Sequence, residues 1–150
     1  MRWILLLCLI GASIGCVANG GQGAADVSEH KLKVLPEDSR WKLVSADIDD
    51  LKHEAGRAVR LEIAGGNLRG DTGCNQFFGG YSLDDSGVIS MQPVVTTKRA
   101  CVDPARNAAE QALLAALRDL QSASLRGEAL VLHTGSGNQL VFEQDPRVAE

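Results

Sequence analysis

Pairs of short apolar runs, each pair separated by a turn sequence, constrain the fold of this chain more than any other feature. Val59, Leu61 and Ile63 alternate with polar residues just before Gly65-Gly66-Asn67. In the same way "CNQFFGGYSL" and "GVISMQPVV" flank "DDSG", and "EALVLHT" and "NQLVFEQ" flank "GSG". Alternation of apolar and polar residues is typical of half-buried strands, and turns this short join antiparallel neighbours. The sequence therefore predicts hairpins, the first over residues 58–72, and a mainly β protein.

One segment has a helical period instead. Asp103 is a good N-cap and Pro104 suits the first helical position, which predicts a helix over residues 104–121. Its apolar residues recur at helical spacing on one face: Ala109, Leu113, Ala116, Leu117 and Leu120. We expect Glu110 to lie away from that face. Hairpin-linked strands and one helix favour an antiparallel meander that forms a barrel-like or half-barrel sheet covered by the helix.

The N-terminus has the pattern of an exported lipoprotein. Positive charge at Met1-Arg2 precedes an apolar run from Ile4 to Ile10, which is too short to span a bilayer, and "ASIGC" follows. This resembles a bacterial lipoprotein signal, so we expect a signal peptide over residues 1–15 and a lipid on Cys16. A flexible tether would cover residues 16–39 and a folded domain residues 40–145. Because Val17 is not an aspartate, we expect a periplasm-facing anchor in the outer membrane.

Export leaves a single intramolecular cysteine pairing. Cys8 is removed with the signal peptide and Cys16 carries the lipid, so Cys74 and Cys101 remain in an oxidising compartment. A Cys74–Cys101 disulfide is the natural interpretation, and two buried reduced cysteines are the alternative. The sequence has no CxxC, and its histidines are scattered at positions 30, 53 and 133. We therefore expect neither a metal nor a cofactor.

The stretch "DTGCNQFFGGY", residues 71–81, does not alternate as a plain strand does. Phe77 and Phe78 are adjacent, and neighbours on a regular strand point to opposite faces. We expect one of them in the core and the other beneath the helix or at an exposed edge. At such an edge, Phe77, Phe78 and Tyr81 would supply a patch for a partner.

The motifs "GCNQFFGGY" and "TTKRAC" together resemble the META domain, the HslJ-like family of small bacterial envelope proteins. A helix after "ACVDP" and the closing "LVLHTGSGNQLVF" hairpin extend the resemblance over about residues 40–143. The motif residues are Trp41, Gly73, Asn75, Gly80, Tyr81, Thr97 and Ala100. The resemblance implies a barrel-like β fold with one helix, an envelope location and a role in heat shock or antibiotic tolerance. It implies no catalytic residues.

Charge and motifs limit the possible functions. The net charge is −4 with no basic run, which argues against nucleic acid. The chain contains no GxSxG, HExxH, P-loop or G-x-G-x-x-G motif, so we expect no enzymatic activity. We expect a monomeric, lipid-anchored protein that binds another envelope component. The alternatives are a small carrier of an apolar ligand, or an adaptor for a secretion channel like the pilotin lipoproteins, whose fold is similar to that of the family.

Overall fold

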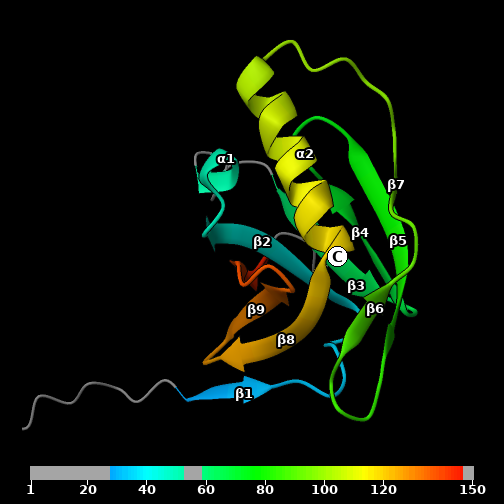
Figure 1. Cartoon of the computed structure of the whole chain (residues 1–150), viewed down its shortest axis with the longest axis vertical. Coiled ribbons are helices and arrows are strands. Elements are labelled where there is room, and N and C mark those ends of the chain that lie inside the picture. Colours follow the sequence, from blue (N-terminus) through cyan, green and yellow to red (C-terminus); the bar gives the residue numbers. More distant parts are fainter. Residues whose placement is uncertain (1–27, 53–58, 147–150) are drawn as a thin grey trace, which may run out of the picture.

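A computed structural model describes residues 28–52 and 59–146. Within these residues all strands lie in one ten-stranded antiparallel sheet, in the order β1-β8-β9-β10-β2-β3-β4-β5-β6, with β7 paired to β5 (Figure 1). The strands are β1 (Glu29–Lys31), β2 (Ser39–Ala46), β3 (Arg60–Ala64), β4 (Asn67–Asp71), β5 (Gln76–Leu83), β6 (Ile89–Met91), β7 (Val95–Thr96), β8 (Leu120–Arg126), β9 (Ala129–Thr134) and β10 (Gln139–Gln144). The helices are α1 (Asp49–Lys52) and α2 (Pro104–Arg118).

The expected hairpins are present and form two meanders. Strands β2 to β6 follow one another across one half of the sheet, β8 to β10 across the other, and the pairing of β10 with β2 joins the halves. The turn between β3 and β4 uses positive φ angles at Gly65 and Gly66, 58° and 72°, which glycine adopts without strain. These local turns set the register, which places Leu61 opposite Gly70 and Ile63 opposite Leu68.

The helix begins where the sequence predicts but ends earlier. Asp103 caps α2, since its side chain accepts a hydrogen bond from Ala105 N at 2.9 Å. The expected end at residue 121 is wrong: α2 ends at Arg118, and β8 begins at Leu120. Leu120 continues the helical spacing of the apolar residues, but it is the first residue of β8, and its side chain is buried there. The side chain of Asp119 accepts a hydrogen bond from Ser136 N, which ties the end of α2 to the turn between β9 and β10.

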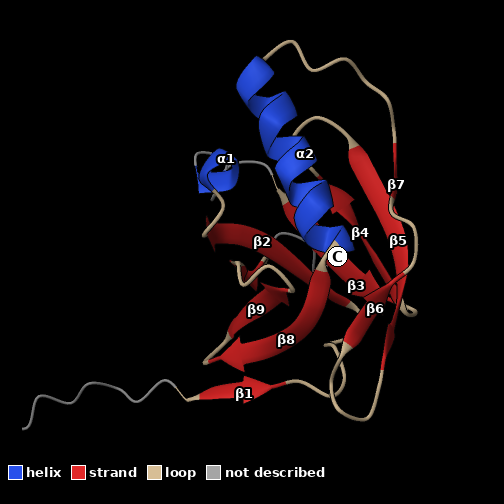
Figure 2. Cartoon of the chain, viewed as in Figure 1, coloured by secondary structure: helices blue, strands red, loops and turns tan. Residues whose placement is uncertain are grey.

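The sheet curls around a core that α2 completes. Figure 2 shows the strands wrapped beneath one end of α2, with α1 beside that helix. The largest fully buried side chains come from both meanders and the helix and include Trp41, Leu43, Leu61, Ile63, Leu113, Leu117, Leu130, Leu132 and Phe142. The fold is therefore a mainly antiparallel half-barrel with one substantial helix, as the sequence predicts.

The folded unit begins before residue 40. Strand β1 pairs with β8, and Leu35 is buried in the core, so residues 28–39 belong to the domain and not to the expected tether. The proposed lipidation site, Cys16, lies outside the described residues. No helix in the described ranges is long and apolar enough to cross a membrane.

Candidate functional site

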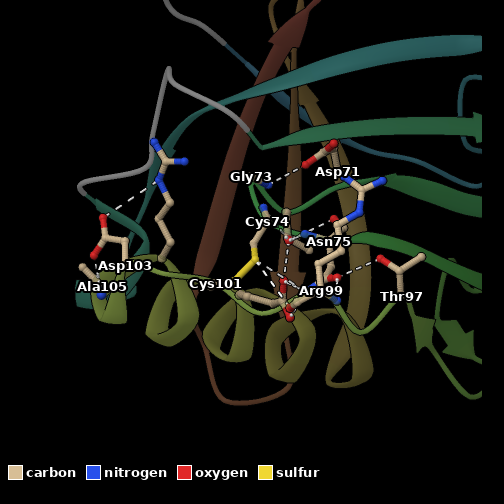
Figure 3. Close-up of a disulfide and its surroundings, with 12 residues drawn as sticks. Asp71, Gly73, Cys74, Asn75, Thr97, Arg99, Cys101, Asp103 and Ala105 are labelled. Atoms are coloured by element: carbon tan, nitrogen blue, oxygen red, sulfur yellow. Dashed lines mark hydrogen bonds and ion pairs between the residues drawn. A yellow bond between two sulfur atoms is a disulfide. The ribbon is translucent and has the colours of Figure 1, made fainter.

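The two halves of the sequence motif meet at Asn75. Its Oδ1 accepts hydrogen bonds from Thr97 Oγ1 at 2.8 Å and Arg99 N at 2.7 Å, so the amide holds the segment after β7 (Figure 3). Gly73 has a φ of 91° and donates its N–H to Asp71. A side chain with a Cβ would be strained at that angle. Gly73, Asn75 and Thr97 therefore form one connection between β4, β5 and the 97–103 loop.

A buried carboxylate completes this connection, and the sequence did not indicate it. Glu110 was expected away from the apolar face of α2, but it is 9% exposed. It accepts hydrogen bonds from Thr72 Oγ1 at 2.6 Å and from Asn75 Nδ2 at 3.0 Å. Glu110, Leu114 and Leu117 lie at positions i, i+4 and i+7, so they share one face of α2. That spacing is the feature of the sequence that indicates a buried Glu110.

Cys74 and Cys101 are paired beside Asn75. Their Cα atoms are 5.9 Å apart, within the range that a disulfide requires (Figure 3). The bridge joins the 72–75 turn to the segment just before α2. The motif cysteines, asparagine and threonine thus gather at one place.

The other motif residues lie elsewhere. Trp41 is buried and donates from Nε1 to Ser39 Oγ at 2.7 Å, while Ala100 is exposed. A Cβ at Gly80 would lie 2.7 Å from the Gln92 side chain. Tyr81 donates to Glu37 at 2.7 Å, and its burial and then this carboxylate raise the pKa of Tyr81 above its ordinary value.

The adjacent phenylalanines point to opposite faces of β5. Phe77 is 4% exposed and packs in the core, whereas Phe78 is 48% exposed. Tyr81 packs against the core on the same side as Phe77. The expected patch of Phe77, Phe78 and Tyr81 is therefore not one surface, because only Phe78 is open to solvent on the outer face.

A groove of about 920 Å³ lies beside Phe78 on the face of the sheet opposite the core. The sheet register places one continuous row of residues across it: Arg40, Glu62, Arg69, Phe78 and Val95. Val95 is 59% exposed, so it and Phe78 present an apolar pair at one end of the row. The charged residues occupy the other end.

Two arginines of this row share one carboxylate. Arg69 and Arg40 both donate to Glu62, and in that order they hold the pKa of Glu62 below its ordinary value. Arg60 pairs through Nε with Asp145 Oδ2 at 2.8 Å, but its buried Nη1 has no hydrogen-bond partner among the described residues. The groove thus combines an apolar end with three arginines and three carboxylates, those of Glu62, Asp71 and Asp145.

A serine, a histidine and a glutamate also meet, between β1, β8 and β9. Ser124 Oγ lies 2.8 Å from His133 Nε2, and Glu29 Oε1 lies 2.9 Å from the same nitrogen. In a catalytic triad the carboxylate contacts the other ring nitrogen. Ser124 is also only 3% exposed. This cluster therefore has the arrangement of a structural contact that holds β1 on β8.

The comparisons agree with the fold and the motif. The META domain model matches residues 30–147. Among solved structures, the chain is similar to an NMR structure of a protein from Burkholderia xenovorans, with 25% identity and a TM-score of 0.59 over 74% of this chain and 84% of that one. A crystal structure of a duf4847 family protein from Bacteroides vulgatus matches with 12% identity and a TM-score of 0.50, covering 74% of this chain and 95% of that chain, and supports the fold alone. No curated protein matches the chain. Because the matched model spans most of the sequence and every described strand but the first residue of β1, this chain belongs to the META domain family.

Proposed function

We propose that this META domain protein is a non-enzymatic, lipid-anchored envelope protein that binds an extended segment of another envelope protein. The observation that carries the proposal is the groove beside Phe78. Aromatic residues, including phenylalanine, and arginine are enriched at protein–protein interfaces, and this groove presents both. A role in tolerance of envelope stress would follow from such binding.

The chemistry of the groove specifies the partner segment. Phe78 and Val95 favour an apolar side chain at one end. Arg40 and Arg69 share a single carboxylate, so a further carboxylate on the partner would form charge-assisted hydrogen bonds there. Strand β7 pairs only with β5 among the described residues, which leaves an edge where an extended backbone could add.

The filled interior favours a protein partner over an apolar ligand. Trp41, Phe142 and a set of leucines occupy the space inside the curled sheet. A carrier of the kind considered from the sequence would require an open interior. The groove, in contrast, is open on the outer face.

Site-specific photo-crosslinking in intact envelopes tests this proposal. A crosslinking residue at position 78 should capture a discrete envelope protein, and the same residue at position 34 should not, although Val34 is 72% exposed. Arg69→Gln should reduce the capture. Arg106→Gln is the matched control, since Arg106 has similar exposure but lies on α2, away from the groove.

Three outcomes would contradict the proposal. The first is equal capture from positions 78 and 34, and the second is capture at 78 that Arg69→Gln leaves unchanged. The third is a crosslink at 78 only to small apolar molecules, which would support the carrier function. Circular dichroism of each variant is the control that the domain is folded.

A further inference from the structure

Three potential metal-ligand atoms meet where the 72–75 turn, the 97–103 loop and α2 come together. The sulfurs of Cys74 and Cys101 and a carboxylate oxygen of Glu110 all lie within 4.8 Å of one another. Thiolate and carboxylate are ligands of Zn²⁺ in proteins. Nothing in the sequence indicates this site, because Cys74 and Cys101 are 27 positions apart and form no CxxC motif.

The surroundings of these atoms hold more acceptors than hydrogens. The two hydrogens of Asn75 Nδ2 face four acceptors: Glu110 Oε1 and Oε2, each at 3.0 Å, Arg99 O at 3.3 Å and Cys74 Sγ at 3.6 Å. The amide cannot be flipped, because its Oδ1 accepts from the backbone N–H of Arg99. Thr72 Oγ1 adds one hydrogen, which is available to Glu110 Oε2 because Asn75 O already accepts from Thr72 N at 2.8 Å. A cation would satisfy the surplus of acceptors.

We propose that the reduced form of this cluster binds a divalent cation of the Zn²⁺ class through Cys74 Sγ, Cys101 Sγ and a Glu110 carboxylate oxygen. The Cα separation of 5.9 Å that suits the disulfide also suits two thiolates on one metal. At a Zn–S distance of about 2.3 Å, tetrahedral geometry places two sulfurs about 3.8 Å apart. Both cysteines are partly exposed, so water can take the fourth position. None of the three ligand residues lines the proposed groove.

The disulfide form and the metal-binding form of the cluster differ by a two-electron reduction. A dithiol reductant attacks the Cys74–Cys101 bond and passes two electrons to its sulfurs, while the reductant becomes a disulfide. Two protons leave the dithiol, and Cys74 and Cys101 each gain one. Metal binding then releases both thiol protons as the two sulfur–metal bonds form, which makes the affinity rise with pH. Asn75 and Thr72 orient the Glu110 ligand through their hydrogen bonds.

Cobalt titration of the full chain tests the proposal. Cys8→Ser and Cys16→Ser leave two cysteines, a phosphine reduces them without air, and Co²⁺ reports thiolate ligation through its charge-transfer and d–d absorption bands. We expect saturation at about one Co²⁺ per chain, displacement by Zn²⁺ and no band in the oxidised protein. Glu110→Gln removes a direct ligand and should weaken binding by at least the roughly 10–100-fold that loss of an outer-shell partner costs. Glu128→Gln, on an exposed turn, is the matched control and should leave the affinity unchanged.

The other possible results also either support the metal site or overturn it. Absence of a thiolate-to-cobalt band in the reduced chain overturns the proposal. Equal affinity of the Glu110→Gln and unsubstituted chains also overturns it, because two thiolates alone would then bind the metal. If reduction unfolds the domain, recovery of the native circular dichroism on adding Zn²⁺ supports the site, and failure to recover it overturns the site.

Discussion

At the residue scale, adjacent Phe77 and Phe78 differ in environment, and the difference is testable. Phe77 packs inside the sheet, so Phe77→Ala should lower the free energy of unfolding by about 3–5 kcal/mol. Phe78 lies on the open face, so Phe78→Ala should cost less than about 1 kcal/mol of stability, while it weakens binding of the proposed partner. Chemical denaturation of the two variants side by side measures both costs. Equal destabilisation would contradict the assignment of Phe78 to a surface.

Asn75 is the second residue whose environment leads to a prediction. Asn75→Ala removes the donor to Glu110 and the acceptor for Arg99 N. Each buried polar group left without a partner costs roughly 1–3 kcal/mol, so we expect a loss of about 3 kcal/mol. Asn67→Ala is the control, because the Asn67 side chain donates to Gly65 O within an exposed turn and its loss should cost less than about 1 kcal/mol. Urea denaturation compares them, and similar losses would show that Asn75 does not hold the segment.

At the element scale, the sequence correctly predicts those turns and helix ends that depend on neighbouring residues. The β3–β4 hairpin depends on two glycines in its turn, and the start of α2 depends on Asp103 and Pro104, all of which are readable locally. The end of α2 was wrong because Leu120 keeps the helical spacing. Strand β1 was missed because all of its residues are exposed, and its partner β8 lies about 95 positions away. The role of Glu110 was missed because its partners, Thr72 and Asn75, lie 38 and 35 positions away in the chain.

The attachment of β1 should depend on pH. The hydrogen bonds from Ser124 and then Arg126 lower the pKa of Glu29 from 4.5 to about 2. A lowered pKa in the folded state means that the contact stabilises the fold fully above pH 4.5 and that this contribution is lost as the pH falls toward 2. Hydrogen exchange of β1 and β8 should therefore rise over that interval. Glu29→Gln should already show the faster exchange at neutral pH and change less on acidification. An identical pH profile for both proteins would contradict this account.

At the scale of the whole molecule, the Cys74–Cys101 bridge constrains the unfolded chain. Its cysteines are 27 positions apart, for which the chain-entropy model gives about 3.5 kcal/mol. A small domain has a total stability of about 5–15 kcal/mol, so the double variant Cys74→Ser, Cys101→Ser should unfold at clearly lower denaturant concentration. Mass spectrometry of alkylated, unreduced protein tests the pairing itself. Alkylation of both thiols in the exported protein would contradict it.

We expect the position of the whole molecule in the cell to depend on Cys16, which lies outside the described residues. An apolar run followed by "ASIGC" predicts that the chain is cleaved before Cys16 and that this thiol carries the lipid. Cys16→Ser should therefore abolish incorporation of labelled palmitate and leave an uncleaved or soluble form, which gel mobility and membrane fractionation detect. Cys8→Ser is the matched control, because we expect Cys8 to leave with the signal peptide, so that its substitution should not change labelling. If Cys16→Ser is labelled as strongly as the unsubstituted protein, the anchor is not at Cys16. In that case the groove beside Phe78 would still remain open to a partner, because it is formed entirely by residues from Arg40 to Asp145.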